Sequence, residues 1–189
     1  MAKVASTMID LGTPCPDFSL PDTEGRTVSR DDFREQPALL VAVLCNHCPF
    51  VKHIRRELAR FAREYQPQGL AMVGISANDI TTHPQDSPER MAEEAASVGY
   101  TFPYLYDETQ DTAKALGAAC TPDFFLYDRD RRLVYRGRFD AATPGNDEPV
   151  TGVELRAAVD ALLAGRPISE DQKPAVGCNI KWTPGNEPD

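Results

Sequence analysis

An unbroken apolar run, ALLVAVL at residues 38–44, is followed by the short segment CNHCP and then by a segment with 3.6-residue periodicity. Seven consecutive apolar residues are typical of a strand buried on both faces, and apolar side chains at helical spacing are typical of a helix packed on a core. The apolar helix face comprises Val51, Ile54, Leu58 and Phe61. Pro49 suits the first helical turn, where a missing N–H costs no hydrogen bond. The pattern predicts a buried strand leading directly into a helix, with Cys45 and Cys48 at the junction.

A second apolar run, GLAMVGIS at residues 69–76, predicts another buried strand. A strand–helix–strand unit of this kind pairs its strands in parallel through a right-handed crossover. Residues 77–87 are polar and predict a loop. Ser87 and Pro88 then supply an N-cap and a first-turn proline for a helix through Val98.

Shorter elements are predicted on either side of this unit. Residues 1–17 predict an irregular lead-in, and the turn segment PDTEGR between two short apolar segments predicts a β-hairpin followed by one helical turn at 29–33. Further along, the pattern predicts a short strand at 102–106 and a helix at 109–116. Two apolar segments around DRDRR predict an antiparallel hairpin.

The last predicted helix precedes a proline-rich tail. Thr151 and Glu154 have the spacing of a capping box, and Gly165 ends the helix. The apolar face of this helix comprises Val153, Val159, Leu162 and Leu163. We expect a single domain over residues 1–165, including the N-terminal hairpin, and an irregular tail over residues 166–189 that packs on it.

Length and charge narrow the possible functions. A chain of 189 residues is long enough to bury a core as one domain. The formal net charge of -9 argues against nucleic acid and anionic membranes as partners, because both require a basic surface. The N-terminal segment lacks the apolar core of a signal peptide, and no later run approaches a membrane span. We therefore expect a cytoplasmic protein, in which a CxxC pair is more often catalytic or metal-binding than structural.

The cysteines at the strand–helix junction predict redox chemistry. Free N–H groups and the positive end of the helix dipole stabilise an anion there, so a cysteine at a helix N-terminus has a lowered pKa and is nucleophilic near neutral pH. Two intervening residues allow the sulfurs to bond. We expect Cys45 to be exposed and to attack a disulfide, and Cys48 to be more buried and to resolve the mixed disulfide.

His47 lies between the two cysteines in sequence. A protonated or hydrogen-bond-donating imidazole favours a thiolate at Cys45 and stabilises the reduced form, which makes the disulfide more oxidising. The alternative interpretation is an exposed loop histidine.

Thr121 and Pro122 lie directly before an apolar strand. Prolines at such junctions often adopt the cis form, which holds the preceding backbone group in a tight turn. With a CxxC segment upstream, this pair predicts a turn that presents its backbone to a substrate disulfide.

The segments GTPCPDFSLPDTEGRTVSRDDF and TPDFFLYDRDRRLVYRG, with the CxxC helix between them, resemble the thioredoxin fold in its TlpA/ResA and AhpC/TSA (peroxiredoxin-like) branch. The resemblance covers residues 12–163. It implies an α/β protein with three α/β/α layers, a mixed central sheet and an N-terminal hairpin extension. It also implies a thiol–disulfide oxidoreductase, without a cofactor or metal, that acts on a protein or small-molecule disulfide and receives electrons from a reductase or thiol donor.

Peroxiredoxins suggest an alternative enzyme, a thiol peroxidase that reduces peroxides and serves as an antioxidant. Cys48-Pro49 matches their peroxidatic Cys-Pro pair, while Cys45 stands at the position of their threonine. Their proline seven residues before the cysteine is Val41 here, and their peroxide-activating arginine falls at Pro122. These departures argue against an efficient peroxidase of the usual type.

Two questions stay open at this stage. The ligand-type side chains of Cys45, His47, Cys48 and His53 also allow a metal-binding or redox-sensing module, although no second CxxC pair completes a zinc site. Cys178, in the tail, is a candidate resolving thiol for an oxidised cysteine at the CxxC segment.

Overall fold

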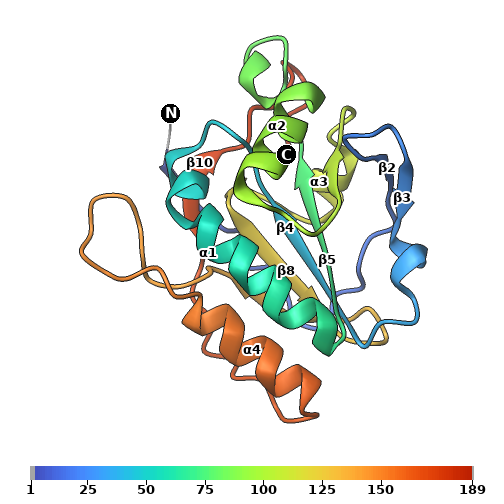
Figure 1. Ribbon diagram of the computed structural model, residues 1–189, viewed down its shortest axis with the longest axis vertical. Helices are drawn as coiled ribbons and strands as arrows, with labels where there is room; N and C mark the ends of the chain where they lie inside the picture. The colour runs from blue at the N-terminus through green and yellow to red at the C-terminus, as the bar shows by residue number, and fades with distance from the viewer. Residues whose placement is uncertain (1–2, 189) are drawn as a thin grey trace.

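A five-stranded mixed sheet, in the order β6-β5-β4-β8-β9, lies at the centre of the computed structural model, which describes residues 3–188 (Figure 1). Its strands are β4 (Ala38–Val43), β5 (Leu70–Ser76), β6 (Tyr104–Tyr106), β8 (Asp123–Tyr127) and β9 (Leu133–Gly137). Strand β4 pairs in parallel with β5 and antiparallel with β8, and every residue of β4 is buried. The two central strands predicted from apolar runs are thereby confirmed.

Helices cover both faces of this sheet. The helices are α1 (Pro49–Tyr65), α2 (Pro88–Val98), α3 (Asp111–Ala115) and α4 (Val153–Leu163). Alternate residues of β4 point to opposite faces, so Leu40 packs in one core with α1, α2 and α4, while Leu39 packs in a second core with α3 and the N-terminal segment. This three-layer α/β/α arrangement confirms the predicted thioredoxin fold.

The N-terminal hairpin and the helical turn after it are also present. They consist of β2 (Ser19–Pro21), β3 (Thr27–Ser29) and the 3₁₀ turn η1 (Arg30–Phe33), with further 3₁₀ turns at η2 (Gln66–Gln68) and η3 (Pro84–Asp86). The last of these lies in the segment that the sequence predicted to be a polar loop. That loop is partly buried, because Asn78 and Asp86 turn inward toward the CNHCP segment.

A second, three-stranded sheet joins the two ends of the chain. It contains β1 (Lys3–Ala5), β10 (Val176–Asn179) and β7 (Cys120–Thr121), in the order β1-β10-β7. The lead-in and the tail, both predicted to be irregular, each contribute a strand to it. The strands form because the backbone edge of β7 offers a pairing partner, which a local sequence pattern cannot reveal.

Helix α4 forms as predicted but begins differently. Its N-cap is Gly152, and the carboxylate of Asp140 accepts hydrogen bonds from the backbone N–H groups of Thr151 (2.7 Å) and Gly152 (2.6 Å). The predicted Thr151–Glu154 capping box is therefore wrong, since Glu154 instead pairs with Arg138. Val153, assigned to the apolar face, is 59% exposed.

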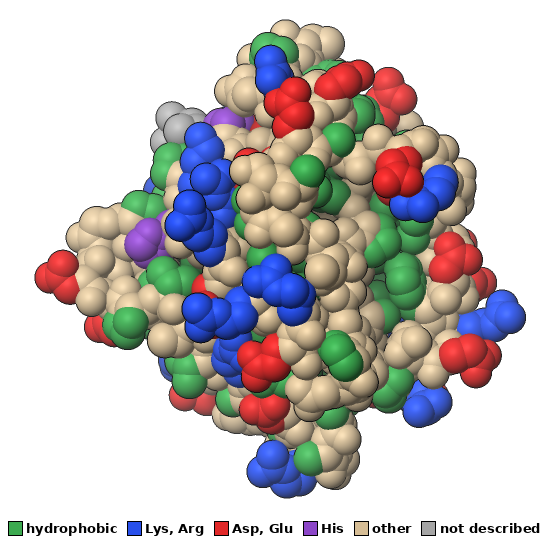
Figure 2. All heavy atoms as spheres, viewed as in Figure 1, with side chains coloured by type: hydrophobic (Ala, Val, Ile, Leu, Met, Phe, Trp, Pro, Cys, Tyr) green, Lys and Arg blue, Asp and Glu red, His purple; other side chains and the backbone are tan. Residues whose placement is uncertain are grey.

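Helix α1, which leads away from the CNHCP segment, presents a basic outer face in an otherwise acidic protein. Lys and Arg side chains gather over it in Figure 2, and its exposed members include Lys52, Arg56, Arg60 and Arg63. Its buried face holds the predicted apolar stripe. Within residues 3–188, no helix is both long enough and apolar enough to cross a membrane.

Candidate active site

The junction of β4 and α1 places two cysteines beside the start of a helix. Cys45 follows the end of β4, and Cys48 is the N-cap residue of α1, directly before Pro49 at the first helical position. The position of Pro49 is the one predicted, because its fixed φ suits a helix start. Among the first-turn N–H groups, that of Val51 acts on the Cys48 sulfur.

The Thr121-Pro122 peptide bond is cis, which confirms the prediction. The resulting turn brings Thr121 against both cysteines. The Cys48 Sγ lies 3.2 Å from the Thr121 carbonyl oxygen, and the Cys45 Sγ lies 3.3 Å from the Thr121 Oγ1. The structure thus brings together four of the residues that the sequence indicated: both cysteines, the threonine and the proline.

A third cysteine completes the cluster. The Sγ of Cys178, on β10, lies 2.8 Å from the Sγ of Cys48. In register, Cys178 pairs with Thr121, the residue before the cis-proline. The sequence contained Cys178 as an open candidate, but its distance of 130 residues along the chain from Cys48 gave no indication of this contact.

The electrostatics of the cluster favour a negative charge on Cys48 over one on Cys45. A hydrogen bond from the Cys45 thiol lowers the pKa of Cys48 to about 4, against the opposing effect of burial, and Cys178 and the Val51 backbone N–H act in the same direction. The same hydrogen bond, together with burial, raises the pKa of Cys45 well above its ordinary value. Burial and the neighbouring Cys48 raise the pKa of Cys178 to about 12. These electrostatics favour Cys48 as the more acidic thiol, whereas the sequence analysis expected the thiolate at Cys45.

All three sulfurs are covered. Cys45 is 1% exposed, Cys48 is buried completely, and Cys178 is 3% exposed. The expected exposure of Cys45 is wrong: its sulfur contacts Thr121, and the tail strand pairs in turn with Thr121. A reactant must be small or must displace part of this cover.

Asp86 is a functional candidate that the sequence analysis missed. Its fully buried carboxylate accepts hydrogen bonds from the backbone N–H groups of Asn46 (2.8 Å) and His47 (3.2 Å) and from the side chain of Asn78 (2.8 Å). Burial alone would raise the pKa of Asp86, but its hydrogen bonds to His47 and Asn78 outweigh that effect and lower it. An ionised Asp86 thus holds the two residues between the cysteines in place.

His47 acts on this carboxylate rather than on the sulfurs. Its Nδ1 lies 2.5 Å from the Asp86 Oδ2, and its ring stacks on His83 with 5.1 Å between centroids. The side chain is mostly buried, so the alternative of an exposed loop histidine is wrong. The negative charge of Asp86 contributes to the raised pKa of Cys45, which opposes the effect expected of His47.

The metal-binding alternative has three possible ligands close together, but one of them, Asp86, already makes hydrogen bonds within the protein. Ligand atoms of Cys45, His47 and Asp86 lie within 4.8 Å of one another. Both oxygens of Asp86 already accept hydrogen bonds from the loop, however, and Cys48 and His53 are not part of this group. A metal would have to replace bonds that position the CNHCP segment.

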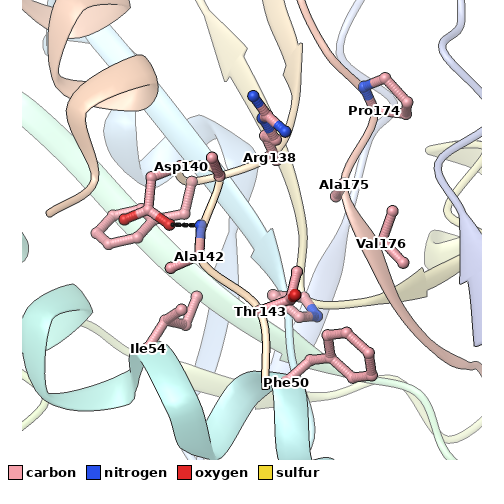
Figure 3. Close-up of a pocket in the computed structure, with 12 residues that line it drawn as sticks. Phe50, Ile54, Arg138, Asp140, Ala142, Thr143, Pro174, Ala175 and Val176 are labelled. Carbon is pink, nitrogen blue, oxygen red and sulfur yellow. Dashed lines mark hydrogen bonds between the residues drawn. The ribbon is translucent and has the colours of Figure 1, made fainter. Parts of the chain in front are cut away.

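A small pocket lies beside the cis-proline turn and is lined in part by Pro122. It has a volume of about 50 Å³ and is lined by residues from α1, the cis-proline turn, the 138–143 segment and the tail. Phe50 lies two residues after Cys48, and Val176 lies two residues before Cys178; both line this pocket (Figure 3). Because Pro122 lines it, this pocket is one candidate approach to the sulfurs, although no cysteine lines it.

Comparison with known proteins agrees with this fold and with redox chemistry. The chain is 28% identical to thiol-disulfide oxidoreductase ResA of Geobacillus thermodenitrificans over 129 residues, 67% of this chain and 68% of that protein. A hypothetical protein from Sinorhizobium meliloti 1021 has a crystal structure with a TM-score of 0.95 and 55% identity, covering 96% of this chain and 99% of that one. Peroxidoxin BcpB of Mycobacterium tuberculosis shares the fold, with a TM-score of 0.62 and 19% identity over 82% of this chain and 97% of that one. Residues 11–136 match the AhpC/TSA family, and the chain belongs to this family of thioredoxin-like oxidoreductases.

Proposed function

We propose that the protein is a thiol–disulfide oxidoreductase in which Cys45 and Cys48 pass between a dithiol and a disulfide. The observation that supports this most is the placement of the acidic Cys48 sulfur at the start of α1, where it and the Cys45 sulfur both meet Thr121. A thiolate is the attacking species in disulfide exchange, and a thiol close to it is needed to finish the exchange. Cys48 would supply the thiolate and Cys45, three residues earlier in the chain, the second thiol.

The roles follow from the charge. The Cys48 thiolate attacks one sulfur of a substrate disulfide, a Cys48–substrate bond forms, and the other half of the substrate leaves as a thiolate. Cys45 then loses its proton and attacks Cys48, so that the Cys45–Cys48 bond forms and the remaining substrate half leaves as a second thiol. The substrate has gained two electrons, and a thiol reductant must return two electrons to the protein.

Other residues have positioning roles in this proposal. Thr121 and cis-Pro122 hold the sulfurs, and His47 acts through Asp86 on the loop between them. The substrate is a protein or small-molecule disulfide, and the electron donor is a reductase or a thiol, in the cytoplasmic setting expected from the sequence.

The test is disulfide reduction with dithiothreitol as donor, measured on oxidised glutathione and on insulin for the wild type, Cys45→Ser and Cys48→Ser. We expect Cys48→Ser to lose the catalysed rate. We expect a double variant, Cys45→Ser with Cys178→Ser, to accumulate a mixed disulfide on Cys48, because neither neighbouring thiol remains to resolve it. Cys15→Ser is the matched control, because Cys15 is buried in the other core and burial raises its pKa to about 11. Wild-type turnover in Cys48→Ser would overturn the proposal.

A second candidate function has one specific observation in its favour. Cys48, the acidic thiol, is also the cysteine that matches the peroxidatic Cys-Pro pair. A peroxidase would transfer one peroxide oxygen to Cys48 as a sulfenic acid, which a neighbouring thiol would convert to a disulfide with loss of water. Consumption of hydrogen peroxide at a rate above that of disulfide reduction would favour this function.

A further inference from the structure

The backbone edge that should receive a substrate is already occupied by the protein's own tail. The turn at Thr121 was predicted to present its backbone to a substrate disulfide. In the structure, β10 pairs antiparallel with this edge, and Cys178 is the register partner of Thr121. An extended peptide that adds a strand to a sheet edge binds in this way. The tail therefore occupies the position of a bound peptide, with its cysteine at the reactive sulfur.

The fit of the tail is close. A Cβ at Gly177 would lie 1.9 Å from the Thr121 carbonyl oxygen, so only glycine permits this approach. On one side of β10, the Ala175 N–H donates to Ser6 Oγ (2.8 Å), which donates to Asp123 (2.8 Å). On the other side, the Lys181 N–H donates to Asn78, the partner of Asp86. The strand is thus tied both to the cis-proline turn and to the loop that holds the CNHCP segment.

We propose that Cys178 is a third redox thiol, which forms a disulfide with Cys48 while β10 occupies the substrate position. This inference deepens the proposed function and rests on it. In the reaction, Cys178 loses its proton and attacks the Cys48 sulfur of the Cys45–Cys48 disulfide. The Cys48–Cys178 bond forms, the Cys45–Cys48 bond breaks, and Cys45 leaves as a thiolate that takes up the proton. The exchange conserves electrons and requires no further oxidant.

The electrostatics set an order for these steps. After burial, the neighbouring Cys48 is the main reason for the raised pKa of Cys178, so Cys178 is a poor nucleophile while Cys48 is a thiolate. Once Cys48 is in a disulfide, that negative charge is gone and Cys178 ionises more readily. Cys178 therefore reacts after Cys48 and does not compete with it for the substrate.

The test is disulfide mapping by mass spectrometry after equilibration in glutathione buffers and rapid alkylation. The proteins are the wild type, Cys45→Ser, Cys178→Ser and Cys120→Ser, the last as the control. Cys120 is also buried and adjoins Thr121, but its sulfur contacts Pro122 rather than Cys48. We expect a Cys48–Cys178 disulfide in Cys45→Ser, both disulfides in the wild type and in Cys120→Ser, and only Cys45–Cys48 in Cys178→Ser.

The outcomes separate the two proposals. If Cys178 stays reduced in the wild type and in Cys45→Ser, where Cys48 instead holds glutathione, the present inference is overturned while the CxxC dithiol stands. If Cys178→Ser forms no Cys45–Cys48 disulfide at any glutathione ratio, but Cys45→Ser joins Cys48 to Cys178, the CxxC proposal fails and the role of Cys178 as a redox thiol is supported. Thermal unfolding of the reduced Cys178→Ser protein, with Cys178→Ala as a second variant, checks that the fold is intact.

Discussion

At the residue scale, the charge on Cys48 depends on its thiol neighbours. The Cys45 thiol is the largest influence that lowers the pKa of Cys48 to about 4. A hydrogen bond to a charged group is worth about 1.5–3 kcal/mol, and one pKa unit corresponds to about 1.4 kcal/mol. We therefore expect Cys45→Ala to raise the pKa of Cys48 by about 1 to 2, measured as the ultraviolet absorbance of the thiolate against pH, with Cys48→Ser subtracted.

The same titration has a consequence for stability. The pKa of Cys48 is lower in the folded protein than the ordinary thiol value of 9.0, so the stabilisation from its thiolate is complete above pH 9 and is lost as the pH falls toward 4. The free energy of unfolding of the wild type relative to Cys48→Ala should decrease over that range. A difference that does not vary with pH, or a thiolate that titrates near 9, would contradict the assignment of the charge to Cys48.

Asp86 and His47 show why residue roles were harder to predict than residue identities. Both cysteines and the cis-proline were found from sequence, because a CxxC at a strand–helix junction and a proline before a strand are local patterns. Asp86 lies 39 residues beyond His47, and only the fold places its carboxylate under the CNHCP backbone. With that partner unknown, His47 was expected to act on Cys45, whereas the structure pairs it with Asp86 and the electrostatics favour a thiolate at Cys48.

At the element scale, β10 depends on its one glycine opposite the turn. Because a Cβ at Gly177 would overlap the Thr121 carbonyl, we expect Gly177→Ala to displace β10 and to cost about 1–3 kcal/mol in stability. It should also slow formation of the Cys48–Cys178 disulfide by about tenfold or more, measured by timed alkylation. Formation of the Cys45–Cys48 disulfide should be retained.

Gly185→Ala is the control for this substitution. Gly185 lies in the same tail with a φ of 82°, and a Cβ there would meet no neighbour within 4 Å. It should therefore show the small cost of a positive φ without the change in disulfide formation. Equal effects of the two substitutions would indicate that the tail tolerates displacement and that β10 is not held against the turn.

The same element marks the limit of prediction from the sequence. The strands β4 and β5 and the helices α1 and α2 were predicted within about a residue, because their apolar patterns are long and their caps are local. Strands β1, β7 and β10 have two to four residues each and owe their existence to one another. Strands this short have no periodicity to detect, so the site's third thiol was not placed.

At the scale of the whole molecule, the sheet β1-β10-β7 connects both ends of the chain to the candidate active site. Cys48 lies between β4 and α1, and Cys178 lies on β10, near the end of the chain. A bond between them would close a loop that contains nearly all of the sheet and every helix, whereas the Cys45–Cys48 bond closes only a few residues. The two disulfides therefore differ in how strongly they constrain the unfolded chain.

This difference predicts a redox-dependent stability. In the chain-entropy description, a crosslink between residues 130 apart stabilises the fold by roughly 5 kcal/mol, and one between residues three apart by roughly 2 kcal/mol. For a protein of this size, the difference corresponds to a rise in melting temperature on the order of 10 °C. Cys45→Ser, which is able to form only Cys48–Cys178, should gain that much more on oxidation than Cys178→Ser, which is able to form only Cys45–Cys48. Calorimetry of each protein, reduced and oxidised, measures both gains in melting temperature. If the oxidised and reduced forms of Cys45→Ser melt at the same temperature, the tail is not covalently joined to the site.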